Sequence, residues 1–249
     1  MNATQTTSAN AQQSISLIGA QQNDLLRALS REDLLALFGD LEMVVLPANK
    51  HLFDYGDSVE YTYFPTNAIV SLQYVMEDGA TTEIAVVGRE GVVGVALYPT
   101  ERASYSAVVQ TAGYGYRLKT AVLREVFYSG GPLAQQLMRY TSAMFAQLAQ
   151  SVAGSRHTSI EQKLCRWLLE RLDRSLTNEL KVTQEMIANM LGVRRESVTG
   201  AAGKLSEEGL ITYRRGCVTV LDRAGMERRA GSCYQASRNK AAQVEQRAA

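Results

Sequence analysis

Hydrophobic and polar residues alternate in short runs through the middle of the chain and follow a helical spacing elsewhere. From Leu41 to about Leu118, brief stretches rich in β-branched and aromatic residues are separated by glycine-containing turns. Many short strands at close spacing favour an antiparallel roll or barrel over alternating strand and helix units. The predicted strands are MVVLP, EYTYFP, AIVSLQYV, TEIAVV, SYSAVVQ and YGYRL. Two short helical turns, Asp24–Leu29 and Arg31–Phe38, precede them, and Ser30 can cap the second.

Helical spacing takes over after the last strand. The pattern predicts a short helix over Thr120–Tyr128 and a long helix from Pro132 to Gly154 or beyond. Proline fits the first turn of a helix because no hydrogen bond requires its missing N–H there. From spacing alone, the apolar stripe of the long helix can equally pack on the roll or form a seam between two copies of the chain. The stripe consists of Leu133, Leu137, Tyr140, Met144, Leu148 and Val152.

Residues 183–207 have the pattern of a helix-turn-helix. Thr183 can cap a first helix, Gly192 ends it, and a second helix begins near Arg194. Glycine suits this turn because a sharp turn between helices needs a left-handed backbone conformation, which a Cβ makes costly. The second helix would bury Val198, Ala201, Ala202 and Leu205 and would direct Arg195, Glu196, Thr199, Gly200 and Lys204 outward.

The outward side chains of the second helix suit the major groove of DNA. Arginine can pair with guanine through two hydrogen bonds, and glutamate can accept from cytosine. The segments GLITY and CVTVL then predict a hairpin whose basic tip is Arg214-Arg215-Gly216, like a wing that follows a recognition helix. Helical hairpins and basic turns are each common, but this order of elements is far more specific. The sequence therefore favours DNA binding.

The overall net charge of +1 hides a difference between the two parts of the chain. Residues 1–155 hold 9 Lys and Arg against 14 Asp and Glu, whereas residues 156–249 hold 17 against 11. The basic C-terminal part suggests an anionic partner, although on charge alone a chance difference between two solvated surfaces is the simpler explanation.

Cysteine usage and the apolar runs indicate where the protein works. Cys165, Cys217 and Cys233 match neither a disulfide framework nor a zinc pattern. The first thirty residues contain no apolar signal core, and no apolar run approaches the roughly 20 residues that span a bilayer. We therefore expect a protein of the reducing cytoplasm without a membrane segment.

These features together resemble the regulator family of the cyclic-AMP receptor protein and the fumarate-nitrate reduction regulator. The resemblance covers roughly residues 20–227 and depends on EQKLCRWLLERLDR, TQEMIANMLGVRRESV and GLITYRRG. It implies an α+β fold with an N-terminal antiparallel β-roll of the cyclic-nucleotide-binding type, a long dimerisation helix and a C-terminal winged helix-turn-helix. The corresponding parts are a disordered arm (1–19), the roll (20–131), the dimerisation helix (132–154), the winged-helix domain (155–227) and a tail (228–249).

The resemblance also implies roles for single residues. Arg195 and Glu196 would read bases, and the stripe that includes Leu137 and Val152 would be the dimer seam. Gly200 stands where many family members have a second base-reading arginine. Thr199 and the wing would therefore contribute more to the choice of DNA site. The residues that would hold phosphates are Thr183, Gln184 and Arg194.

This sequence departs from the family at the candidate effector site. The family's nucleotide cassette begins with Gly-Glu and later has an Arg followed directly by Ser or Thr, which hold the cyclic phosphate. Here the loop reads Gly88-Arg89-Glu90-Gly91, and Arg102 is separated from Ser104 by an alanine. A cyclic phosphate needs a guanidinium and a hydroxyl or amide side by side. We therefore expect no cyclic AMP binding, and the effector is unidentified. Candidate effector contacts are Gly88, Arg89, Glu90, Arg102 and Ser104, while Tyr61, Tyr63, Tyr74 and Tyr105 can line a pocket or merely cover the roll.

The sequence thus predicts a homodimer that binds a near-palindromic duplex site, with RNA polymerase as a further candidate partner and with no cofactor or metal. Two alternatives stay open. An enzyme built on the roll would need clustered metal ligands or an acid–base pair, but His51 and His157 are isolated in the sequence. A protein-interaction module would use the helix-turn-helix to bind another protein instead of DNA.

Overall fold

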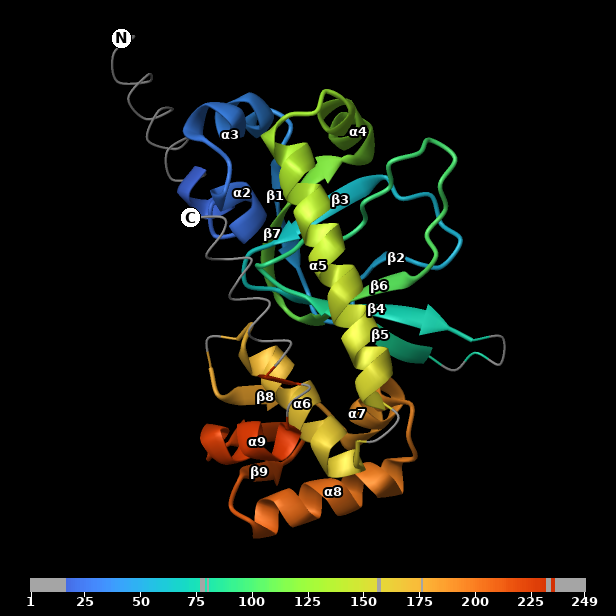
Figure 1. Ribbon diagram of the computed structural model, residues 1–249, viewed down its shortest axis with the longest axis vertical. Coiled ribbons are helices and arrows are strands. Elements are labelled where there is room, and N and C mark those ends of the chain that lie inside the picture. The colour runs from blue at the N-terminus through green and yellow to red at the C-terminus, as the bar shows by residue number, and fades with distance from the viewer. Residues whose placement is uncertain are drawn as a thin grey trace.

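The computed structural model describes residues 17–76, 79, 81–155, 158–175, 177–231 and 234–235. The expected disordered arm up to residue 16, His157, Cys233 and most of the expected tail lie outside these residues. Figure 1 shows a sheet-rich roll with short helices, a long helix beside it, and a small domain at the far end of that helix. None of the described helices has the length and apolar character needed to cross a membrane.

The roll consists of two antiparallel sheets that enclose an apolar interior. One sheet has the strand order β1-β7-β3 and the other β2-β6-β4-β5. Val70, Val87 and Val109 are fully buried in the interior, where side chains of both sheets meet. All six predicted strands are present, and one more, β2, has only three residues. The strands are β1 (Glu42–Leu46), β2 (His51–Phe53), β3 (Tyr61–Pro65), β4 (Ile69–Val75), β5 (Thr81–Val87), β6 (Ser106–Thr111) and β7 (Gly113–Lys119).

Short helices at the N-terminal end of the described chain cover the first sheet. In α3 (Arg31–Phe38), Ser30 is the N-cap, as predicted, and its Oγ accepts from the Asp33 amide at 3.1 Å. The residues Leu17–Ala20 also form a helical turn, and Ala20 is fully buried in the core around α2 and α3. The arm that we expected to be disordered up to residue 19 is therefore ordered from Leu17.

A buried asparagine fixes α2 (Asp24–Arg27) to the roll. Asn23 is the N-cap of this helix and has no exposed surface. Its side-chain amide donates to the carbonyl oxygens of Pro65 and Gly91, both at 2.9 Å. The helix is thereby bound to the end of β3 and to the loop that follows β5.

The long helix α5 (Pro132–Ser155) follows α4 (Thr120–Tyr128) and runs along the roll (Figure 1). The predicted apolar stripe does not stay on one surface. Leu137 is only 2% exposed in the core around α2 and α4, and Tyr140 and Met144 also pack on the roll. Val152, in contrast, is 68% exposed. The N-terminal part of the stripe therefore packs α5 against the roll of its own chain.

The C-terminal domain is a winged helix with its own apolar core. Leu168 and Leu205 are fully buried in it, and Trp167 is 4% exposed. Cys165 is fully buried as well, and burial raises the pKa of its thiol to about 12. The elements are α6 (Ile160–Leu172), β8 (Glu179–Lys181), α7 (Gln184–Leu191), α8 (Arg195–Glu207), β9 (Ile211–Arg214), β10 (Cys217–Val220) and α9 (Arg223–Ala230).

This domain continues past residue 227, where we expected it to end. Ala230, at the end of α9, is 2% exposed, and Tyr234 is 1% exposed in the same core. The hydroxyl group of Tyr234 donates to the Asp173 carboxylate at 3.0–3.1 Å and accepts from Arg223 at 3.0 Å. The first residues of the expected tail are therefore part of the folded domain.

Candidate nucleic-acid interface

The helix-turn-helix has the local geometry that the sequence predicts. Thr183 caps α7, with its side-chain oxygen accepting from the Met186 amide at 3.1 Å. Gly192 ends this helix in a left-handed conformation with φ 63° and ψ 38°. Val198 and Leu205 are fully buried on the inner face of α8. The two helices are thus locked together by their apolar sides, as in the predicted motif.

The opposite face of α8 is open to solvent. Glu196, Thr199 and Gly200 are exposed, and the side chain of Arg195 is 64% exposed. The nearest acidic partner of Arg195 is Glu185, whose carboxylate is 3.8 Å away and 66% exposed. Such a loose surface pair contributes little energy, so the Arg195 guanidinium can turn to another partner.

One hydrogen bond joins the start of α7 to the exposed face of α8. The Thr199 hydroxyl lies 2.7 Å from Gln184 Oε1 and donates to it. This bond leaves the amide nitrogen of Gln184, which can only donate, as the group that can meet an anion. The two residues are 15 positions apart, so residue spacing contains no signal of this bond.

Lys204 is engaged within the domain. Its Nζ lies 2.8 Å from Glu161 Oε1, so it ties the later part of α8 to the first turn of α6. The hydrogen bond from Lys204 lowers the pKa of Glu161 to about 2. Lys204 is therefore less available to an external partner than Arg195.

The wing begins beside the first turn of α7. Arg215 and Gly216 at its tip have φ values of 47° and 76°, the pair of left-handed residues that a two-residue hairpin turn needs. The Val182 amide donates to the Gly216 carbonyl at 2.8 Å, which brings the tip next to Thr183. Arg214 and Arg215 are exposed. The structure therefore brings the predicted residues of α7, of α8 and of the wing into one domain surface.

The candidate effector residues do not form one site. Arg89 is half-exposed and lies 3.9 Å from Asp24, whereas Glu90 turns toward Arg174, just past the end of α6. Arg102 and Ser104 are exposed. Among the described residues, no hydrogen bond or ion pair links these two segments. The structure thus separates the two halves of the expected contact set.

The four candidate tyrosines of the roll do not all lie in the same surroundings. Tyr61 and Tyr63 line a hollow of about 480 Å³, together with Arg117, which stacks on the Tyr61 ring at 4.1 Å. Burial raises the pKa of Tyr63. Tyr74 instead packs edge-on against Tyr55, with ring centroids 6.5 Å apart, and Tyr105 against Phe53. Tyr61 and Tyr63 therefore share this hollow, whereas Tyr74 and Tyr105 pack against other rings.

His51 lies at the surface of the roll, where its Nδ1 is 2.7 Å from Asp54 Oδ1. In the described part of the chain, no three His, Cys, Asp or Glu side chains gather as a metal site would require.

Two family models match the chain. The model of a Crp-like helix-turn-helix domain matches residues 162–229, and the model of a cyclic nucleotide-binding domain matches residues 43–129. The two matched regions contain the winged helix and the roll, respectively, so they support the order of domains described above.

Relatives of known name match most of the chain. It is 27% identical to a global nitrogen regulator of Synechococcus elongatus, over 78% of this chain and 95% of that protein. It is 23% identical to a CRP-like cAMP-activated global transcriptional regulator of Mycobacterium tuberculosis, over 78% and 91% of the two chains. The solved structure of FixK2 from Bradyrhizobium japonicum covers 77% of this chain and 98% of its own with a TM-score of 0.66, at 15% identity. This last likeness shows a shared fold, and the predicted fold class is confirmed.

Proposed function

Because this chain belongs to the Crp/Fnr family of DNA-binding transcription regulators, which are not enzymes, we propose that it binds a near-palindromic duplex site as a homodimer. The observation that carries this proposal is the exposed polar face of α8, which begins with Arg195 and Glu196. In a two-fold dimer, the two copies of α8 would enter successive major grooves about 34 Å apart. RNA polymerase and a cytoplasmic location follow from this role as further proposals.

We assign the dimer seam to the exposed stripe of α5. Met138, Phe145 and Val152 are 65%, 74% and 68% exposed and lie seven residues apart. Ser142 and Ala149 are exposed between them. A repeat of four and three residues is the seam pattern of paired helices. This assignment retains Val152 from the expected seam. It replaces Leu137, Tyr140 and Met144, which pack on the roll, and the half-buried Leu148.

Each half-site would be held by residues with separate roles. Arg195 and Glu196 would read base edges. The Thr199 hydroxyl is bound to Gln184, which leaves the Thr199 methyl group for a thymine methyl and the Gln184 amide for a phosphate oxygen. The other proposed phosphate contacts are Thr183, Arg194, Arg214 and Arg215.

We further propose that the roll does not bind cyclic AMP, although one relative is named as cAMP-activated. Glu90 is engaged with Arg174, and by the resemblance Arg89 would stand where the family has its ribose-binding glutamate. Arg102 is followed by Ala103 and not directly by a Ser or Thr. In a thermal-shift measurement, cyclic AMP should leave the transition unchanged, whereas a ligand at 100 times its Kd would add about 2.7 kcal/mol.

Selection of duplexes from a randomised pool by the full-length protein tests the main proposal. We expect an enriched two-fold sequence whose half-sites are 10–10.5 base pairs apart, centre to centre, or a multiple of that spacing. Sedimentation of the complex should show two chains per duplex. Enrichment of a sequence without two-fold symmetry would contradict the dimer, and no enrichment would contradict sequence-specific binding.

A further inference from the structure

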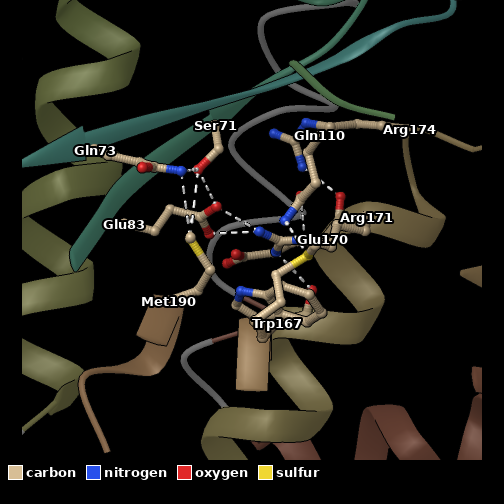
Figure 2. Close-up of polar contacts among 10 residues, drawn as sticks. Ser71, Gln73, Glu83, Gln110, Trp167, Glu170, Arg171, Arg174 and Met190 are labelled. Carbon is tan, nitrogen blue, oxygen red and sulfur yellow. Dashed lines mark hydrogen bonds and ion pairs between the residues drawn. The ribbon is translucent and has the colours of Figure 1, made fainter. Parts of the chain in front are cut away.

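The roll and the winged-helix domain meet at a contact whose central groups are charged (Figure 2). Arg171, near the end of α6, lies against the sheet that contains β5 and β6. One of its terminal nitrogens lies 2.6 and 2.5 Å from the two carboxylate oxygens of Glu83 on β5. Its Nε donates to Gln110 Oε1 on β6 at 2.7 Å. A single side chain of the DNA-binding domain is thus bound to two strands of the sensor roll.

This ion pair is almost completely buried. The side chains of Arg171 and Glu83 are 1% and 7% exposed. The guanidinium stacks on the ring of Trp167, with 3.4 Å between Cζ and the ring centroid, and donates to the Trp167 carbonyl at 3.0 Å. Ser71 on β4 donates to Oε2 of Glu83 at 2.5 Å, the carboxylate oxygen that also accepts from Arg171 at 2.5 Å. Removing either charge would leave its partner buried without its closest opposite charge, which is strongly unfavourable.

A second pair lies one turn further along the chain. Arg174 Nε is 2.6 Å from Glu90 Oε1, and the same oxygen accepts from the Gly88 amide at 3.1 Å. Gly88 and Glu90 belong to the candidate effector loop, which directly follows β5. The strand with Glu83 and the loop with Glu90 are therefore one continuous segment, bound at two points to the end of α6.

Polar groups, and not a shared apolar core, fix the two domains to each other. The described core of the winged helix is formed by residues between Leu164 and Tyr234. The two described cores of the roll are formed by residues between Ala20 and Leu137. Where α7 approaches the sheet, Met190 Sδ lies 3.7 Å from Ser71 Oγ and from Gln73 Nε2. Interfaces of this polar kind can separate and re-form more readily than a continuous core.

We propose that the pairs Glu83–Arg171 and Glu90–Arg174 form a latch that sets the orientation of the DNA-binding domain. We assign DNA binding to the latched arrangement, in which the polar face of α8 is exposed. An effector that engages the Gly88–Gly91 loop would act by moving Glu90, and β5 with it, away from α6. This inference rests on the proposed function, since DNA affinity is one of its readouts.

Fluorescence of Trp167 tests the latch directly. This residue is the chain's single tryptophan, is 4% exposed and lies under the Arg171 guanidinium. Glu83→Gln removes the buried carboxylate charge, so we expect a red shift of the emission and an increase of about twofold or more in the acrylamide quenching constant. The matched control is Glu42→Gln, because Glu42 pairs with Arg117 at 2.6 Å within the roll. Equal quenching in the two variants would overturn the latch.

DNA affinity is the second readout, measured by anisotropy on the duplex that the wild-type protein enriches. Glu83→Gln should weaken binding by about tenfold, in the range of ordinary coupling between sites, while Glu42→Gln stays at the wild-type value. If Glu83→Gln fails to fold, Glu90→Gln is the second variant, because the Glu90 side chain is 30% exposed and its charge is less deeply buried. A variant with an exposed Trp167 and wild-type DNA affinity would overturn the orientation role. A wild-type protein that enriches no duplex would refute the proposed function instead.

Discussion

Arg195 opens α8 with a side chain that is 64% exposed and only loosely paired with Glu185. Little energy is lost when such a pair separates, so the guanidinium can bind a guanine. Arg195→Ala should cost about 1–3 kcal/mol on the selected duplex and should relax base preference at one position of each half-site. Anisotropy on duplexes with single base changes measures both effects. An equal loss on every sequence would mean that Arg195 contacts a phosphate.

Gly200 is an exposed glycine inside a helix, one turn after Glu196. A methyl group there would meet no atom within 4 Å in the free protein. Gly200→Ala should therefore raise the free energy of unfolding by up to about 1 kcal/mol, through helix propensity. It should also weaken binding to the selected duplex, because the added methyl group faces the groove.

Gly203 offers the matched control for this change. It is exposed in the same helix, one turn later, and a methyl group added there would also meet no atom within 4 Å. Gly203→Ala should stabilise the free protein to a similar extent in urea unfolding but should leave DNA affinity unchanged. If both variants bind DNA like the wild type, the backbone at Gly200 does not approach the duplex closely.

At the scale of elements, α8 and α6 share an apolar core, and the ion pair between Lys204 and Glu161 adds a polar contact at its edge. The hydrogen bond from Lys204 lowers the pKa of Glu161 to about 2. A carboxyl group whose folded pKa lies below its unfolded value of about 4.3 stabilises the protein above that value. The advantage of the wild type over Lys204→Met should therefore be present at pH 7 and should disappear as the pH falls from about 4 toward 2. Lys204→Arg should retain the advantage in urea unfolding, and a pH-independent difference would contradict the pairing.

The two faces of α5 should respond differently to substitution. Phe145, on the outer face, is 74% exposed, whereas Leu137, on the inner face, is 2% exposed. Phe145→Asp should shift the protein from dimer to monomer in sedimentation and leave the stability of the monomer intact. Leu137→Ala should preserve the dimer and lower the free energy of unfolding by about 2–5 kcal/mol, the usual cost of a core cavity. A dimer that survives Phe145→Asp would place the seam elsewhere.

Elements with a strong local signal could be predicted from the sequence to within a residue. The predicted ranges Thr120–Tyr128 and Arg31–Phe38 coincide with α4 and α3, because apolar spacing marks both helices and the Ser30 cap marks the start of α3. The strands β2 and β8 have three residues each, too few for an alternation to be visible. The helix α9 buries little besides Met226 and Ala230, so its sequence has no clear apolar face.

In the candidate site too, features set by neighbouring residues could be predicted and contacts between distant positions could not. The cap at Thr183, the turn at Gly192 and the polar face of α8 follow from neighbouring residues and could be predicted. The bond between Gln184 and Thr199 spans 15 positions, and the Glu83–Arg171 contact spans 88. Contacts of this kind arise only when the chain has folded. On α5, spacings of three and four fit both faces equally, so periodicity located the helix but not its seam.

At the scale of the whole molecule, the described residues join the roll and the winged-helix domain through α5 and through polar contacts. The chain passes from the roll to the winged helix through α5, and the contact around Glu83 and Arg171 is the second connection. A signal that reaches β5 thus has a direct route to α6 that does not pass along α5. Differential affinity of an effector for the latched and open states would then change DNA affinity without any contact between effector and DNA.

The symmetry of a dimer makes a further prediction about salt. Each phosphate contact contributes about −0.9 to the slope of log K against log salt concentration, and a two-fold dimer makes every contact twice. Removing one wing arginine per chain should therefore make the slope less steep by about 1.8 in a dimer, but by only about 0.9 in a monomer. Arg215→Asn suits this test, because asparagine tolerates the left-handed conformation with φ 47° that Arg215 adopts. The wing should thus keep its fold while it loses one charge. Arg228→Asn, at an exposed arginine of α9, controls for general charge effects.

Anisotropy titrations of the selected duplex between 50 and 200 mM salt, roughly the range in which phosphate contacts dominate, give the slopes. A slope equal to that of the wild type would remove Arg215 from the phosphate contacts, and a change of about 0.9 would mean that a single wing engages the DNA.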